Sequence, residues 1–187
     1  MIEYTTSSTD KDMLGIIALQ KSNLPENLSP EDMQSQGFVT VVHSFEVLKK
    51  MNGIEQNIVA KDNDKVVAYL LAMTEKSKND IPILLPMFAL FEKIMLQGKP
   101  LAAYKYLVVG QVCVSKDYRG QGILDNCYAA YKKHFKDKYD FAVTEIATKN
   151  LRSVKAHERI GFKEIHRYAE PGKEEWSVVI WDWNDIL

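Results

Sequence analysis

The sequence predicts a mixed α/β fold in which a central sheet is covered by helices on both faces. A nearly continuous apolar run, Tyr106–Val114, is typical of a central strand that is buried on both sides. Apolar residues recur at helical spacing from Ile123, after a short polar connection. Further strand-like and helix-like segments alternate along the chain, and this order favours a layered α/β domain.

The N-terminal region begins with a short strand at Ile2–Thr5. Thr9 or Asp10 is expected to cap the next helix, because its side-chain oxygen can accept a hydrogen bond from a free backbone amide. The predicted apolar stripe of this helix consists of Met13, Leu14, Ile17 and Ala18. A second, brief helix is predicted from Ser29-Pro30-Glu31-Asp32, where serine precedes proline and two acids.

A strand, a short helix and a hairpin come next. β-branched residues favour a strand at Phe38–Val42, and the helix Phe45–Met51 is expected to end at Asn52-Gly53. The hairpin pairs Ile58–Ala60 with Val66–Leu71 around a polar turn.

Residues 77–103 interrupt this pattern and are predicted to form an insertion with partial helix inside one domain of residues 1–187. The apolar run Ile81–Phe91 contains two prolines and is too short and too broken to span a bilayer. For its large apolar residues, core packing is favoured over lining or covering a ligand pocket. These residues are Met87, Phe88 and Phe91.

The C-terminal half continues the alternation of helices and strands. The helix from Ile123 is expected to reach about Lys138, with an apolar stripe of Ile123, Cys127, Ala130, Tyr131 and His134. The segments that follow are a strand at Phe141–Thr148, a helix at Asn150–Ile160 closed by Gly161, a strand at Phe162–Tyr168, a turn at Pro171-Gly172 and a last strand at Trp176–Trp183. Trp181 and Trp183 are expected to share one face of the last strand.

The charge balance argues against polyanion binding. The chain has 24 Lys and Arg residues against 25 Asp and Glu residues, so neither nucleic acid nor a membrane surface is an expected partner. The start, Met1–Thr5, lacks the basic and apolar parts of a secretory signal, which predicts a cytoplasmic protein. Cys113 and Cys127 lack metal-ligand spacing and are expected to be buried thiols.

A glycine turn, Tyr118-Arg119-Gly120-Gln121-Gly122, connects the apolar strand to the helix that begins at Ile123. Glycines let successive backbone amides point outward, and together with a helix N-terminus they form a cradle for an anion. A turn of this kind also occurs for steric reasons alone. A Walker loop is excluded because Gly-Lys-Ser/Thr is missing, and a dinucleotide fingerprint because the third glycine and its acidic partner are missing.

The second informative segment is Asn150–Phe162, a helix that follows a strand, starts with asparagine and ends with glycine and phenylalanine. With both segments in this order, the chain resembles the GNAT superfamily of N-acetyltransferases. The resemblance rests on Arg119-Gly120-Gln121-Gly122 and Asn150–Phe162, and the order of the flanking elements extends it over the whole domain. It implies a GNAT-like, mostly antiparallel split sheet, in which the strands ending at Val114 and near Thr148 diverge to admit acetyl-CoA.

The resemblance also implies which residues bind acetyl-CoA. Backbone groups of Val112, Cys113 and Val114 would pair with the pantetheine arm as an added strand does. Asn150 would hydrogen-bond the pantetheine, with Ser153 beside it in the helix. The pyrophosphate would be held by the amides of Arg119, Gly120, Gln121, Gly122, Ile123 and Leu124. The family's final Gly or Ala falls on Leu124, whose side chain has to point away from the phosphate or shift the cradle.

Two departures from the family pattern concern catalysis. The family's tyrosine seven residues after the asparagine, which protonates the leaving thiolate, is His157 here; a histidine can also donate a proton, and simple packing is an alternative of equal weight. Many relatives place a glutamate base on the strand before the cradle, where this chain has Gln111. Glu145, on the facing strand, is the candidate base, against the alternative of an exposed strand carboxylate. His43 and His166 have no predicted role.

The sequence therefore predicts an acetyl-CoA-dependent N-acetyltransferase that transfers acetyl directly to a primary amine of a small molecule. The resemblance implies no metal. A non-catalytic acyl-CoA sensor of the same fold is the alternative, favoured by Gln111 and His157. A nucleotide-binding or phosphate-binding domain would explain the glycine turn but not Asn150–Phe162. The acceptor and a homodimer through the last strand stay open, because neither is written in the sequence.

Overall fold

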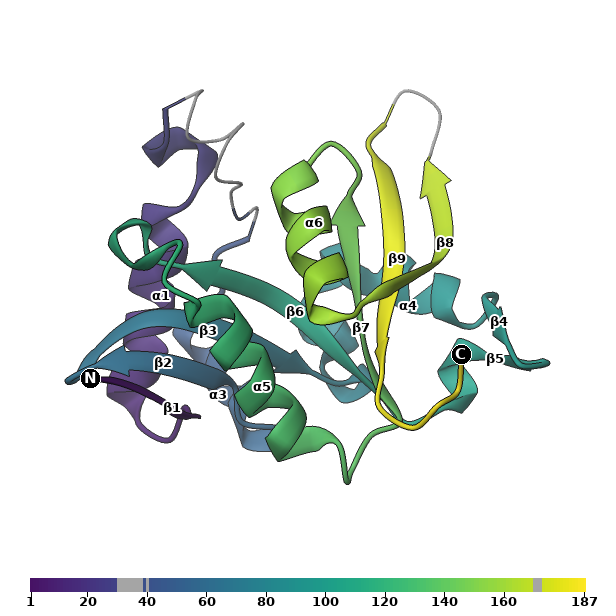
Figure 1. The fold of residues 1–187 in the computed structure, drawn as a ribbon, viewed down its shortest axis with the longest axis horizontal. Helices are drawn as coiled ribbons and strands as arrows, with labels where there is room; N and C mark the ends of the chain where they lie inside the picture. Colours follow the sequence, from purple (N-terminus) through teal and green to yellow (C-terminus); the bar gives the residue numbers. More distant parts are fainter. Residues whose placement is uncertain (30–38, 40, 170–172) are drawn as a thin grey trace. The chain divides into compact units, whose positions relative to one another are not determined.

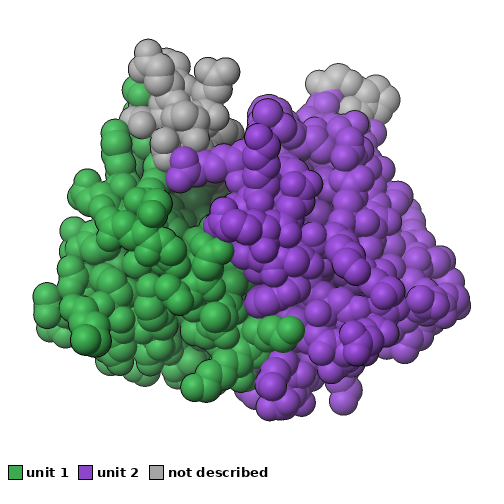
Figure 2. Space-filling model, viewed as in Figure 1, with its two compact units in different colours: residues 1–73, 109–134 green, residues 74–108, 135–187 purple. Residues whose placement is uncertain are grey.

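Helices and strands alternate along the chain, as Figure 1 shows with colours that follow the sequence. The computed structural model describes residues 1–29, 39, 41–169 and 173–187. The chain forms two compact units (Figure 2): the first unit is residues 1–73 with 109–134, and the second unit is residues 74–108 with 135–187. Strand β6 (Tyr106–Val114) belongs to both, because the division falls within it. The predicted organisation as one domain with an insertion stays a prediction.

The first unit is built on antiparallel strands. Three of them are neighbours in the sheet: β1 (Ile2–Thr6), β2 (Ile58–Asp62) and β3 (Lys65–Met73). The predicted hairpin of β2 and β3 is confirmed, and Asn63 at its turn has a left-handed φ of 52°. β3 is buried at eight of its nine positions. A strand is buried in this way when helices cover both faces of its sheet.

Within the described residues, three α-helices accompany these strands: α1 (Asp10–Ser22), α3 (Phe45–Ile54) and α5 (Ile123–Phe135). In Figure 1, α1 and α3 lie on one face of the strands and α5 on the other. Thr9 caps α1 as predicted, because its hydroxyl accepts a hydrogen bond from the Asp12 amide at 3.1 Å and Asp12 accepts one from the Thr9 amide at 3.0 Å. A short 3-10 helix, η1 (Pro25–Asn27), follows α1.

The predicted apolar stripe of α1 was wrong in part. The buried apolar positions are Met13, Ile16 and Leu19, whereas Leu14 is 56% exposed. Apolar residues occur around much of this helix, so their spacing does not single out the side that packs on β3. Contact with the sheet decides which side is buried.

Two helix ends also differ from the prediction. α3 continues through Asn52 to Ile54, because the Asn52 side chain donates to the Ser7 carbonyl oxygen at 3.0 Å and accepts from the Asn57 amide at 3.0 Å. α5 ends at Phe135. Its His134 is exposed, because the packed side of the helix is formed by the buried Tyr128 and Tyr131 and not by the histidine. The helix predicted from Ser29 and part of the strand predicted at Phe38–Val42 fall outside the described residues; Val41 and Val42 are in no strand.

In the large sheet, the described strands of the second unit form one parallel and two antiparallel pairs. Its strands beyond β6 are β7 (Phe141–Ala147), β8 (Lys163–Ala169) and β9 (Glu175–Asp182). β6 pairs in parallel with β7 as far as Val108↔Val143, where the pairing ends although both strands continue. β9 pairs antiparallel with β7 and with β8, which gives the strand order β1-β2-β3-β6-β7-β9-β8. The wedge for acetyl-CoA stays a prediction.

Helices lie on both faces of these strands in Figure 1: α4 (Leu85–Phe91) and α6 (Leu151–Ile160). Tyr106 lies opposite Phe141 of β7 and meets Phe91 of α4 edge-on, with ring centroids 5.5 Å apart. Trp181 lies opposite Ala142, the next residue of β7, and stacks on Phe162, which directly follows α6 and Gly161. Because successive strand residues point to opposite faces, α4 and α6 pack on opposite sides.

The segment predicted as an insertion contains several short elements. They are η2 (Glu75–Asp80), η3 (Pro82–Leu84), α4, the paired strands β4 (Met95–Leu96) and β5 (Lys99–Pro100), and η4 (Leu101–Ala103). Met87, Phe88 and Phe91 of α4 are buried, which agrees with core packing. The aromatic residues of α4 thus hold this segment against β6.

The mixed α/β fold class, with a mostly antiparallel sheet between helices, is confirmed. Cys113 and Cys127 are buried free thiols, and the Trp181 and Trp183 rings meet edge-on at 5.7 Å, both as predicted. Among the described residues, no helix combines the length and the apolar character needed to cross a membrane.

Candidate functional site

The glycine turn of the first unit has the backbone conformation that an anion cradle requires. After β6 and the short helix η5 (Lys116–Tyr118), Gly120 and Gly122 adopt left-handed φ angles of 75° and 74°. Within the described part of the chain, the amides of residues 120–124 have no hydrogen-bond acceptor. Unpaired amides at the N-terminus of a helix attract an anion such as a phosphate group.

A Gly122→Ala substitution is expected to weaken CoA binding and to destabilise the fold by about 1–2 kcal/mol. A Cβ atom at this position would meet only Asn126 Nδ2, at 3.9 Å, so the cost comes from the left-handed backbone and not from a clash. Gly53→Ala in α3 is the matched control, because nothing lies within 4 Å of its Cβ position and alanine favours a helix by about 0.5–1 kcal/mol. Urea unfolding and CoA titration of both variants test this, and equal behaviour of the two would contradict it.

Arg119 anchors the glycine turn to its own unit. Its Nε donates to the Val114 carbonyl oxygen at 3.0 Å, and its Nη2 donates to Asn23 Oδ1, at the end of α1, at 2.7 Å. Its backbone amide, which was predicted to bind the pyrophosphate, already donates to the Lys116 carbonyl oxygen at 3.3 Å. Arg119 therefore positions the turn, and the unpaired amides begin at Gly120.

The remaining predicted cofactor residues of the first unit differ in exposure. Ile123 is 4% exposed and belongs to the core, whereas Leu124, where the family has a smaller residue, is half-buried. The Gln121 side chain is exposed and donates to the Asp117 carbonyl oxygen at 2.9 Å. What these residues present to an anion is therefore their backbone.

The two cysteines are unsuited to nucleophilic chemistry. Burial raises the pKa of the Cys113 thiol to about 12, against a smaller lowering by the charge of Arg119. Burial also raises the pKa of the Cys127 thiol to about 12. Because the thiolate is the reactive form, neither side chain is a candidate for a covalent acetyl intermediate. Val112 and Val114, which flank Cys113 in β6, are half-buried.

Gln111 is the centre of a polar network. Its Oε1 accepts hydrogen bonds from the Tyr69 hydroxyl at 2.7 Å and from Gln20 Nε2 at 2.9 Å. Its Nε2 donates to the Val41 carbonyl oxygen at 2.9 Å. Tyr69 and Gln20 are fully buried. Gln111 is therefore held as an uncharged amide that both accepts and donates.

His43 is a further member of this network. Its Nδ1 lies 2.9 Å from Gln20 Nε2, and its backbone amide donates to Gln20 Oε1 at 3.0 Å. An amide nitrogen only donates, so Nδ1 carries no proton and the ring is neutral. Burial lowers the pKa of His43, which agrees with this state. No spacing in the sequence links the network, because its members come from α1, β3, β6 and the segment before α3.

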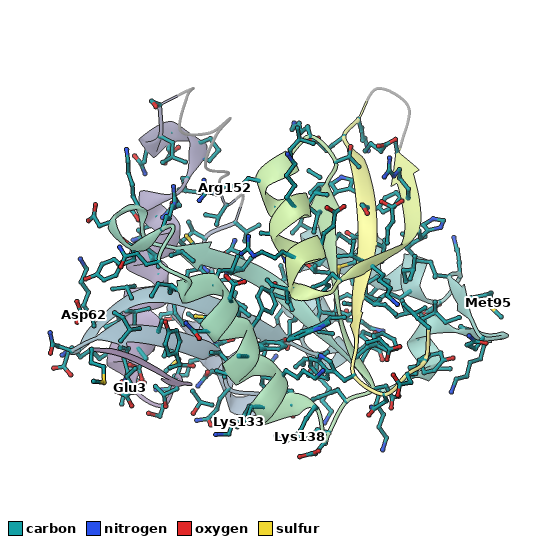
Figure 3. The ribbon with its side chains drawn as sticks, viewed as in Figure 1. Glu3, Asp62, Met95, Lys133, Lys138 and Arg152 are labelled. Atoms are coloured by element: carbon teal, nitrogen blue, oxygen red, sulfur yellow. The ribbon has the colours of Figure 1, made fainter. Side chains whose placement is uncertain are left out.

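In the second unit, Asn150 caps α6. Its Oδ1 accepts a hydrogen bond from the Ser153 amide at 3.2 Å, and its backbone amide donates to the Ala147 carbonyl oxygen at 2.8 Å. Among the described residues, no acceptor lies within reach of its Nδ2. This amino group can donate a hydrogen bond to a ligand. Arg152, labelled in Figure 3, is an exposed cation in the first turn of the same helix.

His157, the predicted acid, is a buried and neutral ring. It is 3% exposed, and its Nδ1 lies 2.8 Å from the Ser153 carbonyl oxygen, which can only accept, so Nδ1 carries the proton. Burial lowers the pKa of His157 to about 4, against an opposing effect of the Ser153 hydrogen bond. Its ring meets Phe162 edge-on at 5.0 Å. A neutral imidazole is a poor proton donor, so this arrangement favours the packing role.

His157 is expected to lower the free energy of unfolding by up to about 3 kcal/mol as the pH falls from about 6.5 to about 4. The unfolded ring binds a proton near pH 6.5, whereas the folded ring stays neutral down to about pH 4, so acid favours the unfolded chain. His157→Phe keeps an aromatic ring beside Phe162 and removes this dependence. Urea unfolding of both proteins across this range measures it, and identical pH slopes would refute the buried neutral ring.

Glu145, the predicted base, is a half-buried carboxyl group on β7. Burial raises its pKa to about 7, and the Tyr168 hydroxyl, which donates to Glu145 Oε1 at 3.0 Å, acts in the opposite direction. A carboxyl group with a pKa near the working pH is present partly as carboxylate and is still basic enough to accept a proton. This environment is typical of a general base.

Glu145 and His157 lie on opposite faces of the sheet. Glu145 and Ala142 are three residues apart on β7 and therefore point to different sides. Ala142 lies opposite Trp181, which stacks on Phe162 beside His157. The two predicted catalytic groups therefore cannot act from the same side of the strands.

Solved structures of acetyltransferases share this fold over nearly the whole chain. The ribosomal-protein-S18-alanine N-acetyltransferase from Escherichia coli is 12% identical with a TM-score of 0.64, covering 98% of this chain and 95% of that one. yncA from Salmonella typhimurium, solved with its cofactor acetyl-CoA, is 10% identical with a TM-score of 0.63 and coverage of 98% and 95%. A spermidine N-acetyltransferase chimera from Vibrio cholerae and hSSAT is 12% identical with a TM-score of 0.58 and coverage of 97% and 95%.

At these identities the similarity shows the fold, and the acceptors of these proteins do not transfer to this chain. No curated protein matches the sequence. The described residues include no group of three or more His, Cys, Asp or Glu side chains that could hold a metal ion. The profile of the Acetyltransferase (GNAT) family matches residues 31–162, which contain the glycine turn, Asn150 and the whole of α6. Since this match covers well over half of the sequence, the chain belongs to the GNAT family of acetyltransferases.

Proposed function

We propose that the protein transfers the acetyl group of acetyl-CoA directly to a primary amine of a small molecule, with Glu145 as the general base. The observation that carries this proposal is the half-buried Glu145 carboxyl group, whose pKa is raised to about 7 and whose Oε1 is held by the Tyr168 hydroxyl. The GNAT family match supports acetyl transfer as the reaction class. Gln111 is not available as a base, because its side chain is an amide within a closed network.

For the cofactor, the amides of residues 120–124 are our candidates for the pyrophosphate, since they have a left-handed turn and no acceptor within the described chain. Backbone groups of Val112 to Val114 are the candidates for the pantetheine arm, with the Val112 amide for the thioester oxygen. Asn150 Nδ2 is a second candidate donor. The Ser153 backbone amide donates to Asn150 Oδ1 in the cap of α6. The Ser153 hydroxyl lies 3.3 Å from His157 Nδ1.

In the proposed reaction, the amine nitrogen attacks the thioester carbon, so that the new C–N bond forms and the C–S bond breaks. The proton lost by the nitrogen passes to the Glu145 carboxylate, directly or through a water molecule. CoA leaves as the thiolate and takes a proton from solvent, because His157 is neutral and buried at the pH of the reaction. An amine with an ordinary pKa near 10 needs such a base to become nucleophilic.

Direct transfer predicts that acetyl-CoA alone leaves the protein unmodified. Both thiols are buried and protonated, so no nucleophilic thiolate is available to accept the acetyl group. Intact-mass spectrometry after incubation with acetyl-CoA, without any amine, is expected to find only the unacetylated chain. Acetylation of Cys113 or Cys127 in amounts that match the protein would contradict direct transfer.

The proposed function is tested by thiol release from acetyl-CoA with a panel of amines. The panel contains a simple alkylamine, spermidine, a free amino acid and a peptide with an N-terminal alanine, because proteins of this fold act on both polyamine and protein acceptors. Release with a small amine and not with the peptide is the expected result.

A non-catalytic acyl-CoA sensor is the second candidate, and two observations favour it. Gln111 cannot act as a base, and His157 is neutral where the family has its acid. Calorimetric titration with CoA separates the candidates: CoA binding without thiol release for any amine supports the sensor, whereas turnover excludes it.

A further inference from the structure

Glu145 and three other polar or aromatic side chains lie together on one face of the second unit. In the strand register, Glu145 of β7 lies opposite Val178 of β9, which lies opposite His166 of β8. The next row along the strands consists of Ala147, Trp176 and Tyr168. Residues of one row share a face, and so do residues two positions apart. We name Glu145, His166, Tyr168 and Trp176 the Glu145 cluster.

The Tyr168 ring forms the middle of this cluster. Its hydroxyl reaches Glu145 Oε1 at 3.0 Å although β9 lies between their strands, so the ring has to cross β9. The ring therefore covers Val178, which is fully buried. The His166 ring stacks on Tyr168 with centroids 6.2 Å apart and an interplanar angle of 22°. All four side chains of the cluster are partly exposed, so a small molecule has access to them.

The chemistry of the cluster suits a cation on an alkyl chain. Aromatic faces attract an ammonium group through their negative quadrupole, and a nearby carboxylate adds charge complementarity. The same carboxylate repels an acceptor that carries its own carboxylate close to the amine. A neutral alcohol of similar size gains neither interaction.

We propose that the Glu145 cluster is the surface that recognises the acceptor, and that it selects the primary ammonium group of an alkylamine over that of a zwitterionic amino acid. The ammonium lies against the Tyr168 and Trp176 rings and presents its proton to Glu145, which then accepts it. This inference rests on the proposed function, because it takes Glu145 as the general base. It adds the class of acceptor and the residues that choose it.

The kinetic test compares two substitutions of Tyr168. Tyr168→Leu removes the ring and is expected to raise the KM for n-butylamine by about 5- to 30-fold, with the KM for acetyl-CoA unchanged. Tyr168→Phe keeps the ring, so its KM for n-butylamine stays near that of the parent. Loss of the hydroxyl removes a hydrogen bond that favours the carboxylate, so the acid limb of its pH–rate profile moves to higher pH. An unchanged KM for n-butylamine in Tyr168→Leu would overturn the proposal, as would equal increases in both variants.

A binding measurement keeps this test separate from turnover. Saturation-transfer difference NMR is expected to detect n-butylammonium on the parent protein and on Tyr168→Phe, with a lost or much weaker signal on Tyr168→Leu and none for 1-pentanol. Binding with this pattern but no acetylation of any amine supports the recognition surface and defeats the proposed function. Acetylation that is indifferent to Tyr168→Leu defeats the recognition surface and leaves the proposed function standing.

Discussion

Glu145→Gln is expected to lower kcat/KM for acetyl transfer to an amine by about 100-fold or more, because a general base contributes this much or more to the rate. Glutamine keeps the size of the side chain and can still accept a hydrogen bond from Tyr168, but it cannot take up the proton of the amine. CoA affinity is expected to stay the same. Thiol-release kinetics with the best amine of the panel, together with CoA titration, measure both quantities.

The matched control for Glu145→Gln is Glu164→Gln on β8. Glu164 lies opposite Val179 and therefore on the other face of the sheet, where its carboxylate accepts hydrogen bonds from Arg167 and from Ser177. We expect Glu164→Gln to leave kcat/KM nearly unchanged. Similar losses of activity in the two variants would show that the effect of Glu145→Gln is not specific to the base.

The pH dependence gives an independent reading of Glu145. A carboxyl group with its pKa raised to about 7 is protonated and inactive below that pH, so kcat/KM is expected to rise through about pH 7 in the parent protein. The unfolded chain releases the Glu145 proton near pH 4.5, whereas the folded protein keeps it up to about pH 7. The free energy of unfolding is therefore expected to fall as the pH rises from about 4.5 to about 7. Both dependences disappear in Glu145→Gln if Glu145 is their source.

Gln111→Glu, which introduces a carboxylate that could serve as a base, is expected to destabilise the protein by about 2–4 kcal/mol and not to raise turnover. A carboxylate can still accept hydrogen bonds from Tyr69 and Gln20. It cannot donate to the Val41 carbonyl oxygen, which would face a negative oxygen instead of an amino group. Thermal unfolding is expected to show a Tm lower by about 5 °C or more.

Gln56→Glu is the matched control for Gln111→Glu. Gln56 is also half-buried in the first unit, but its amino group makes one long hydrogen bond, to the Ser7 carbonyl oxygen at 3.3 Å. A much smaller change in Tm is expected. An active and equally stable Gln111→Glu protein would show that the network tolerates a charge and that position 111 can serve as a base.

The elements that could be predicted from the sequence are those whose ends depend on nearby residues. Asn150 caps α6 through the Ser153 amide, and Gly161 ends it with a left-handed φ of 112°, so both signals lie within the helix itself. The hairpin of β2 and β3 follows from its alternating residues and polar turn. The packed side of α1 could not be predicted, because it depends on contact with β3, far along the chain.

The chemical states of the candidate catalytic residues belong to the tertiary structure. Gln111 and Gln20 are 91 positions apart in the sequence and yet share a hydrogen bond, so no local pattern distinguishes a network amide from a lost base. The same holds for Glu145 and His157, whose residue types allow either proton transfer or packing. Burial raises the pKa of one and lowers the pKa of the other, and burial exists only once the chain is packed.

What the sequence determined by itself is the order of the elements, the glycine turn and the capped helix after it, because backbone conformation at glycine and asparagine is a local property. Those features were enough to predict the family. Tertiary structure alone decided that Glu145 and His157 face opposite sides, that His157 is neutral and that Tyr168 crosses β9 to reach Glu145. The physical reason is that solvation and side-chain contact are set by which strands become neighbours, and that choice is made across the whole sheet.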